Sequence, residues 1–131
     1  MNDAILRIGI AGYGVVGKRR HKNIDLHPFL KVTSVCDRDE SNFFDLAPKI
    51  NKYQHYKEML ESEELDAIFV CMTNDIASEV TINALYSDLH VFCEKPPGRN
   101  VSEIENVIRV EKTKPELKLL YGFNHRHHES V

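Results

Sequence analysis

Short apolar runs alternate with helical stretches along the whole of this 131-residue chain. This order is typical of a parallel β-sheet, because parallel strands need crossover connections, which are usually helices. Right-handed crossovers then place helices on both faces of the sheet. We therefore predict an α/β fold with a doubly wound, mostly parallel sheet of six strands. The strands are expected at residues 5–11, 31–36, 52–55, 67–72, 90–93 and 117–123.

Apolar residues at helical spacing mark the connections between these runs. Before the last connection, Asn100 and Glu103 stand at the spacing of a capping box, which predicts the start of a helix. On that helix Ile104, Val107 and Ile108 are expected to face the sheet. The other helices are expected at residues 15–26, at 76–85, and as short helices between 39 and 48 and around 56–60.

The overall composition excludes several classes of protein. A hydrophobic content of 42% and a charged content of 28% are ordinary for a soluble globular protein, and residues 1–131 are expected to form one domain. A net charge of -3 gives no basic field for binding nucleic acid or an anionic membrane. The longest apolar run, at residues 67–72, is far too short to span a bilayer. The N-terminus has no secretory signal, so a cytoplasmic protein is expected.

Two sets of side chains with potential chemistry are interpreted as structural. Cys36, Cys71 and Cys93 are widely spaced and form no CxxC pair, so they predict neither a zinc site nor a redox motif. We expect all three to be small buried hydrophobic residues. The basic run at residues 18–22 is expected to be a solvated helix face with a modest attraction for phosphates. It lacks the aromatic residues on which a single-strand binder stacks bases.

A glycine-rich turn follows the first expected strand. Residues 12–17 match G-x-G-x-x-G, the fingerprint of dinucleotide-binding Rossmann folds. In that fold the first glycine makes the sharp turn, the second lets the pyrophosphate approach the backbone, and the third lets the helix pack closely on the strand. The pattern alone also fits an ordinary tight turn, but here a strand precedes it and a helix begins inside it. We therefore interpret the whole segment as cofactor-binding: Gly12, Tyr13, Gly14, Val15, Val16 and Gly17.

An acidic residue follows the second expected strand, twenty residues beyond Gly17. Asp37 can accept hydrogen bonds from the adenosine ribose hydroxyls and would repel a 2′-phosphate, which favours NAD. Arg38 complicates the choice, because its guanidinium can pair with a 2′-phosphate or lie over the adenine. NAD is favoured, and NADP or dual use stays open. The alternative for Asp37 is a turn acid that caps the next helix, a role that Asp39 would fill equally well.

A second motif, Glu94-Lys95-Pro96-Pro97, follows directly on the fifth expected strand. Ligands bind at the carboxyl ends of the strands in open α/β sheets, so Lys95 is expected to project toward the cleft. A lysine there can donate a hydrogen bond to a substrate hydroxyl or carbonyl oxygen and stabilise charge that develops on it. The alternative is that Glu94 and Lys95 are merely polar residues of a loop.

Taken together, these motifs resemble the Gfo/Idh/MocA oxidoreductases, the family of glucose–fructose oxidoreductase and inositol dehydrogenase. The resemblance covers essentially the whole chain, and the Glu-Lys-Pro element is its most specific part. The segments that carry it are Ile8-Gly9-Ile10-Ala11-Gly12-Tyr13-Gly14, Cys36-Asp37, Val91-Phe92-Cys93-Glu94-Lys95-Pro96 and Tyr121-Gly122-Phe123-Asn124-His125-Arg126.

The resemblance implies an enzyme that transfers hydride between a nicotinamide ring and a sugar, cyclitol or nucleotide-sugar substrate. It implies that Lys95 lies at the active site between cofactor and substrate, and that Glu94 helps to order it. Thr73 and Asn74 match the family loop that passes the cofactor, but the usual proline and histidine of that loop are replaced by Asn74 and Ser78. Thr73 and Asn74 are therefore weaker candidates for cofactor binding.

The resemblance also implies a second, substrate-binding domain, which supplies an aspartate and an acid–base histidine. Because the chain stops at Val131, that domain is expected to be absent and the chain to be a truncated form. We expect such a chain to bind cofactor without turnover and to self-associate through the sheet face that the second domain would cover.

Three alternatives remain at this point. In the first, the chain is an NAD(H)-sensing or partner-binding module without catalysis. In the second, the same cleft holds another nucleotide such as S-adenosylmethionine. His125, His127 and His128 stand close enough in sequence to suggest a metal site, but no metal is expected, because so short a tail lacks the residues that orient metal-bound histidines.

Overall fold

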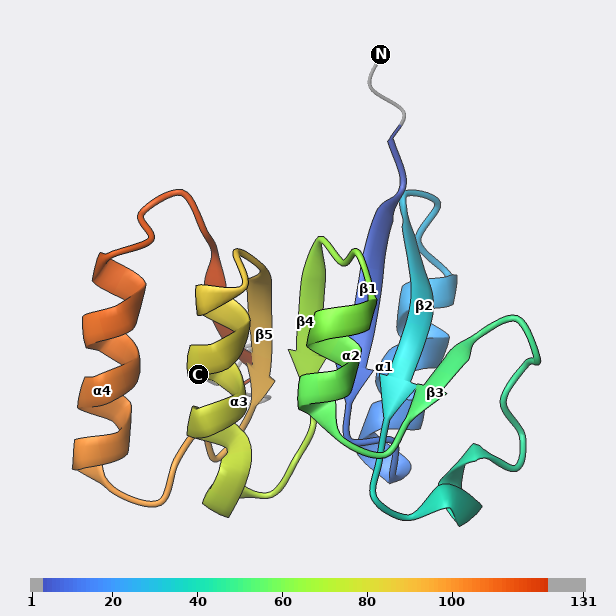
Figure 1. Ribbon diagram of the computed structural model, residues 1–131, viewed down its shortest axis with the longest axis horizontal. Coiled ribbons are helices and arrows are strands. Elements are labelled where there is room, and N and C mark those ends of the chain that lie inside the picture. The colour runs from blue at the N-terminus through green and yellow to red at the C-terminus, as the bar shows by residue number, and fades with distance from the viewer. Residues whose placement is uncertain (1–3, 123–131) are drawn as a thin grey trace, which may run out of the picture.

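The computed structural model describes residues 4–122, which form a single parallel sheet with helices on both faces (Figure 1). The strand order is β3-β2-β1-β4-β5-β6, and every neighbouring pair is parallel. The predicted doubly wound fold is confirmed. The strands are β1 (Leu6–Ala11), β2 (Leu30–Cys36), β3 (Asn51–Tyr53), β4 (Ala67–Val70), β5 (His90–Glu94) and β6 (Leu119–Gly122).

The helices divide between the two faces of the sheet. Figure 1 shows α2, α3 and α4 in front of the sheet and α1 behind it. The chain runs outward from β1 to β3 on one side and from β4 to β6 on the other, so the strand order reverses between β1 and β4. That reversal is where open α/β sheets bind ligands. The helices are α1 (Val15–Asp25), the 3-10 turn η1 (Glu40–Phe43), α2 (Tyr56–Ser62), α3 (Asn74–Tyr86) and α4 (Val101–Lys112).

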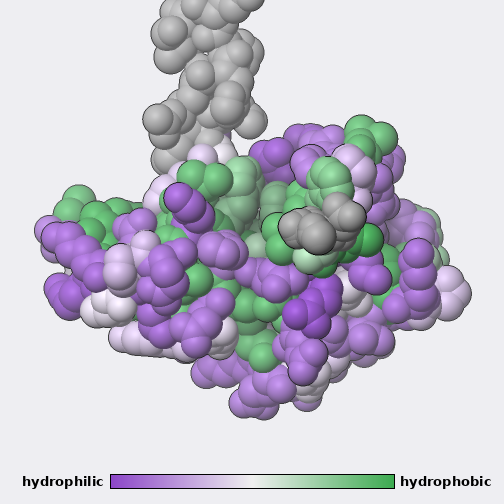
Figure 2. All heavy atoms as spheres, turned by 90° about the horizontal axis from the view of Figure 1, so that it is seen from above, coloured by the Kyte–Doolittle hydropathy of each residue, from purple (hydrophilic) through white to green (hydrophobic). Residues whose placement is uncertain are grey.

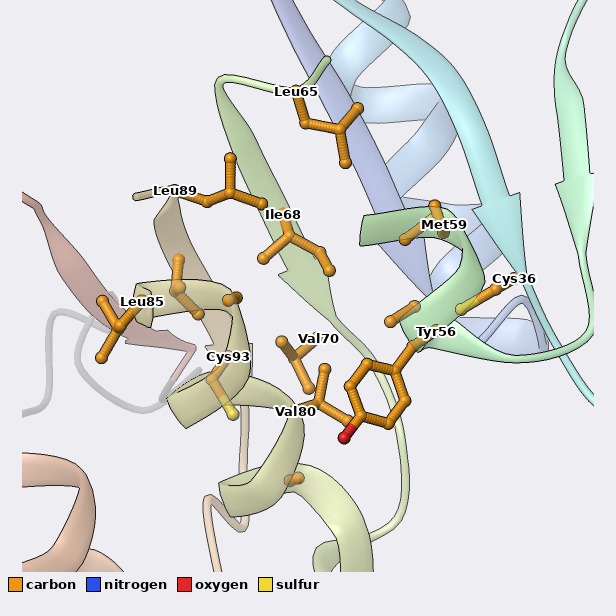
Figure 3. Close-up of a cluster of buried hydrophobic side chains, with 14 of the residues drawn as sticks. Cys36, Tyr56, Met59, Leu65, Ile68, Val70, Val80, Leu85, Leu89 and Cys93 are labelled. Atoms are coloured by element: carbon orange, nitrogen blue, oxygen red, sulfur yellow. The ribbon is translucent and has the colours of Figure 1, made fainter. Parts of the chain in front are cut away.

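Two apolar cores hold these layers together. The larger core lies between the sheet and the front helices, where Figure 3 shows side chains of β4, β5 and α3 pointing toward one another. Ile68, Val70, Val80 and Leu85 are fully buried there. The smaller core lies on the α1 face, around Ile10 and other residues of β1 and β2. The continuous apolar run of β4 packs its even-numbered residues into the larger core and leaves the other two only half-buried on the α1 face.

The predicted inward face of α4 is wrong at one position. Ile108 is 42% exposed, and the fully or nearly buried positions are Val107 and Val110. Because the helix meets the sheet edge along a narrow stripe, residues three apart share the contact and the intervening position faces outward. The predicted cap is present: the Asn100 side chain accepts from the backbone N–H of Glu103 at 3.0 Å. The Glu103 carboxylate accepts from the backbone N–H of Arg99 at 2.7 Å instead of closing a capping box.

The face of β4, β5 and β6 on the α1 side carries no helix among the described residues. We call it the bare sheet face; it is lined by Leu6, Leu30, Phe69, Phe92 and Leu120. Leu6 is 42% exposed and Leu120 61% exposed, while Phe69 and Phe92 stack at 4.8 Å between ring centroids. Figure 2 views the molecule from the edge where the strands begin and shows hydrophobic atoms exposed among hydrophilic ones.

Candidate dinucleotide site

The three glycines of the turn between β1 and α1 meet different surroundings. Gly12 has a φ of +95°, and a Cβ there would lie 2.4 Å from the Cys71 carbonyl oxygen. A Cβ on Gly17 would lie 2.1 Å from the Gly12 carbonyl oxygen. Both glycines are therefore required by the fold itself. A Cβ on Gly14 would meet nothing within 4 Å, so the fold leaves open space at that position.

Gly14 is also the N-cap of α1, and no side chain caps that helix end. Its φ of -82° and ψ of -153° are extended values that any residue adopts. The first turn of α1 has no acidic residue, and Val15 is 75% exposed. The free amides and the positive end of the helix dipole therefore face solvent, an arrangement that binds phosphates.

Asp37 follows the end of β2 and reaches back to the glycine turn. One carboxylate oxygen accepts from the backbone N–H of Tyr13 at 2.8 Å, and the other accepts from the backbone N–H of Asp39 at 2.8 Å. Each oxygen keeps a lone pair for a further donor such as a ribose hydroxyl. The capping role considered for this residue belongs to Asp39, which accepts from the backbone N–H of Ser41 at 3.1 Å.

A crevice of about 740 Å³ opens beside these residues, at the carboxyl ends of β1, β2 and β4. Its volume is within the range of cofactor sites. Five of the residues expected to bind cofactor line its walls: Gly12, Gly14, Asp37, Arg38 and Thr73. The others do not line it: Tyr13, Val15, Val16, Gly17, Asn74, Glu94 and Lys95. Sequence analysis missed further wall residues from β4, α2 and α3, which include His55, Tyr56, Met72, Asp75, Ile76 and Glu79.

The missed wall residues include two fixed carboxylates. The Thr73 hydroxyl donates to Asp75, which lowers the pKa of that carboxyl, and the nearby Arg99 and Arg38 lower it further. The Tyr56 hydroxyl donates to Glu79. Burial and that acceptor raise the pKa of Tyr56. This side of the crevice is therefore negatively charged at neutral pH and faces Arg38.

Glu94, the last residue of β5, forms an ion pair with Arg20 of α1. The Glu94 side chain is 13% exposed and that of Arg20 is 23% exposed. The Arg20 guanidinium also lies 5.0 Å from the centre of the Phe92 ring, a cation–π contact. Sequence analysis missed this pair because Arg20 was interpreted as part of a solvated helix face.

The rest of that basic run also corrects the interpretation of a solvated face. Lys18 is 22% exposed and its Nζ lies 2.7 Å from an Asp45 oxygen. His21 Nδ1 lies 2.6 Å from the Tyr13 hydroxyl oxygen. Positions 18, 20 and 21 of the run are therefore half-buried and only positions 19 and 22 are exposed, because a helix that lies on a sheet buries one side of every turn.

Lys95 lies just beyond β5 and is exposed. Within residues 4–122 it forms no hydrogen bond or ion pair, and the Lys95–Pro96 peptide bond is cis. Its ammonium is therefore available to a ligand. The carboxylate of Glu94 contacts Arg20 and not Lys95.

The three cysteines are unpaired in the structure. Cys36 and Cys93 are buried as predicted, but Cys71 is half-buried, because it lies where β4 opens into the crevice. Burial raises the pKa of Cys36 and Cys71 to about 12 and that of Cys93 to about 11. At neutral pH all three are protonated thiols and poor nucleophiles.

Neither a metal-binding cluster nor a membrane-spanning helix is present in the part of the chain that the structure describes. Between residues 4 and 122, no group of three histidine, cysteine or acidic side chains is placed to hold a metal ion. The same part of the chain has no helix with the length and apolar character needed to cross a membrane. His125, His127 and His128, with Asn124 and Arg126, lie outside the described residues.

Comparison with known proteins gives close matches over the described fold. The chain is 30% identical over 124 residues to myo-inositol 2-dehydrogenase of Thermotoga maritima, which covers 92% of this chain and 37% of that enzyme. It superposes with a TM-score of 0.88 on scyllo-inositol dehydrogenase of Lactobacillus casei with bound NAD(H) and scyllo-inositol, at 25% identity, covering 96% of this chain and 38% of that one. The chain thus spans less than half the length of these relatives.

A family model describes the same region. The oxidoreductase family with an NAD-binding Rossmann fold, Gfo/Idh/MocA, matches residues 6–123. The match includes the glycine turn, Asp37 and the Glu94-Lys95-Pro96 segment, and the fold and crevice agree with it. This chain belongs to the Gfo/Idh/MocA oxidoreductase family and comprises its NAD-binding domain.

Proposed function

We propose that this chain is the cofactor-binding part of an oxidoreductase that transfers hydride between a nicotinamide and a sugar, cyclitol or nucleotide-sugar substrate. Gly14 carries the proposal. A side chain there would meet no protein atom, and the backbone angles are extended, so the open space beside Gly14 supports a ligand that approaches the backbone at this position. The relatives with 25–30% identity include dehydrogenases of inositols, which supports a polyhydroxylated substrate.

The residues of the crevice have distinct tasks in cofactor binding. The backbone around Gly14 and the start of α1 hold the pyrophosphate through amides, with Val15 and Val16 shielding its flank. Asp37 is already oriented by two backbone N–H groups, so it accepts from ribose hydroxyls without losing rotamer freedom. Thr73 and Asn74 lie at the start of α3, on the path from adenosine to nicotinamide.

We expect NAD to be favoured over NADP. A 2′-phosphate would meet Asp37 on one wall, and Asp75 and Glu79 on the other. Two cationic side chains line the crevice, Arg38 and Lys57, and the nearby Asp75 partly neutralises the charge of Arg38.

Lys95 is the proposed catalytic residue; it lies just beyond β5, outside the walls of the crevice. The nicotinamide supplies hydride acceptance and donation when it is bound. Lys95 donates a hydrogen bond to the substrate oxygen and stabilises negative charge on it. Glu94 is proposed to order the segment that carries Lys95, by anchoring it to α1 through Arg20.

Calorimetric titration of the chain with NAD⁺, NADH, NADP⁺ and NADPH tests the proposal. We expect binding that favours the NAD forms, weakens about tenfold or more in Asp37→Ala, and is unaffected in the matched control Asp88→Ala, whose carboxylate lies outside the crevice. Equal binding of all four cofactors by Asp37→Ala and the unchanged chain would overturn the assigned role of the acid. We expect no turnover of inositols by the chain alone, because it spans only 37–40% of its relatives' length.

Two further properties are proposed. The three free thiols favour a reducing compartment such as the cytoplasm. The bare sheet face predicts self-association of the chain, because contiguous exposed apolar surface promotes contact between molecules. Sedimentation velocity over a range of concentrations checks this, and a single monomeric species throughout would contradict it.

A further inference from the structure

A second hollow, of about 870 Å³, lies on the α1 face of the sheet, beyond the glycine turn. It has no lining residue in common with the crevice. The connection between β2 and β3 spans residues 37–50 and contains only the 3-10 turn η1, so no α-helix covers this part of the sheet. Figure 1 shows the connection swinging outward past β3. The space between that connection, α1 and β2 therefore remains open.

The hollow is basic although the whole chain is acidic. Its walls carry four lysines (Lys18, Lys22, Lys31 and Lys49) against two aspartates, Asp25 and Asp45, while the chain has a net charge of -3. Lys18 is neutralised by Asp45 at 2.7 Å, and Asp25 lies 3.5 Å from His21. Lys22, Lys31 and Lys49 form no ion pair within residues 4–122. Three cations around one cavity thus lack a protein counter-ion.

The floor of the hollow combines apolar side chains with one unused polar group. Val32, Leu46 and Ile50 line it together with Tyr13. Thr33 lies where the register between β1 and β2 shifts, so its side chain has no place in either core. The Thr33 hydroxyl is buried and has no hydrogen-bond partner among the described residues, a costly state unless a ligand or water completes it.

We propose that this hollow, the lysine hollow, binds a small organic phosphate: a phosphate dianion attached to an apolar or aromatic body. Lys22, Lys31 and Lys49 supply the charge that a phosphate requires, as point cations on flexible stems. The Thr33 hydroxyl gains a partner from the ligand. The apolar floor takes the body of the molecule, so inorganic phosphate alone binds more weakly.

One residue, Tyr13, connects the lysine hollow with the cofactor crevice. Tyr13 lines the hollow, while its backbone N–H donates to Asp37, a wall residue of the crevice, at 2.8 Å. The Tyr13 hydroxyl lies 2.6 Å from Nδ1 of His21, which also lines the hollow. A ligand in the lysine hollow therefore lies beside a residue of the glycine turn.

The test is a nuclear magnetic resonance titration of the ¹⁵N-labelled chain with phenyl phosphate, with phenol and inorganic phosphate as separate probes. We expect saturable shifts of amides at residues 31–33 and 46–50 with phenyl phosphate, and weaker binding of each half-probe. The double variant Lys31→Glu/Lys49→Glu should weaken phenyl phosphate binding roughly tenfold. The matched variant Arg109→Glu/Lys112→Glu, on the exposed side of α4, should leave it unchanged.

Three results would overturn the proposal. Shifts confined to residues 12–17 would place the phosphate at the glycine turn of the crevice. Equal loss of affinity in both double variants would show non-specific attraction to positive charge. Equal affinity for phenol and phenyl phosphate would show an apolar site in which the lysines have no part. Amide spectra of both variants, recorded without probe, separate these results from a failure to fold.

Discussion

The adenosine end of the cofactor crevice and the end of β5 that precedes Lys95 differ in how firmly the protein holds them. At the adenosine end, both oxygens of Asp37 accept hydrogen bonds from backbone N–H groups. A side chain at Gly12 or Gly17 would collide with a carbonyl oxygen. At the other end, Lys95 is exposed and forms no polar contact within residues 4–122. The Asp37 carboxylate is therefore oriented without a ligand, whereas the segment that carries Lys95 is anchored through the ion pair of Glu94 with Arg20.

The glycine turn should show the largest effect. Gly17→Ala places a methyl group 2.1 Å from the Gly12 carbonyl oxygen, so α1 must move off β1. We expect a loss of about 3 kcal/mol or more in the free energy of unfolding, measured by urea denaturation. Gly14→Ala is the matched control, and it should lower that free energy by less than about 1 kcal/mol, the cost of alanine in place of glycine at an N-cap. Equal stability of the two variants would show that the turn is less tightly packed than the structure indicates.

The ion pair between Arg20 and Glu94 connects α1, which follows the glycine turn, with the end of β5 that precedes Lys95. Arg20→Met leaves the largely buried Glu94 carboxylate without its cation, so we expect a loss of about 1–3 kcal/mol in the free energy of unfolding. The double variant Arg20→Met/Glu94→Met should recover much of that loss, because no unpaired charge remains. Additive losses in the two single variants and the double variant would show that the ion pair contributes no coupling energy.

Asp66 lies away from the crevice, and its carboxyl gives a contribution to folding stability that depends on pH. Burial opposes ionisation of Asp66, but hydrogen bonds from the backbone N–H and guanidinium of Arg7 outweigh it and lower the pKa of the carboxyl below 3.8. A lowered pKa stabilises the folded state above the unfolded value, and this stabilisation is lost as the pH falls through the folded value. Asp66→Asn should therefore lower stability by about 1 kcal/mol at neutral pH.

The difference between Asp66→Asn and the unchanged chain should shrink as the pH falls below 3.8, where the carboxyl of the unchanged chain also becomes neutral. Thermal unfolding followed at several pH values measures it. A difference that stays constant down to the acid transition would show that the hydrogen bonds of the side chain matter and its charge does not. Cofactor affinity should be the same in both proteins, since Asp66 lies away from the crevice.

Lys95 should show the smallest effect. Because it forms no polar contact within the described residues, Lys95→Met should change the free energy of unfolding by less than about 0.5 kcal/mol. Cofactor affinity of the chain should also be unchanged within about twofold, since Lys95 does not line the crevice. A large loss of stability would show that the ammonium has a structural partner.

Local patterns in the sequence were sufficient to predict much of the fold. The alternation of strands and helices, the glycine spacing and the acid after β2 are all signals within about twenty residues, and each has a fixed geometric consequence in a parallel sheet. The same patterns placed Lys95 at a strand end. All six strands begin or end one to two residues away from the expected bounds, because strand ends depend on pairing with neighbours.

Long-range pairing set the limit of sequence reasoning. Arg20 and Glu94 are 74 residues apart, and nothing in the run of basic residues at 18–22 distinguishes the residue that pairs with Glu94. Asp75 and Glu79 form a crevice wall only once α3 is packed beside β4. Their nearness to Thr73 was the one available signal. The exposed Ile108 shows that a hydrophobic residue type alone does not fix which side of a helix is buried.

The central claim is that the open space at Gly14 exists for a bound dinucleotide. Calorimetric titration of NAD⁺ into the unchanged chain and into Gly14→Ala tests it most directly, with unfolding curves of both proteins beside it. We expect saturable binding to the unchanged chain, and at least about tenfold weaker binding to a variant of nearly equal stability, because the new methyl group occupies the approach of the pyrophosphate. Equal affinity in the two proteins, or no binding to either, would contradict the claim.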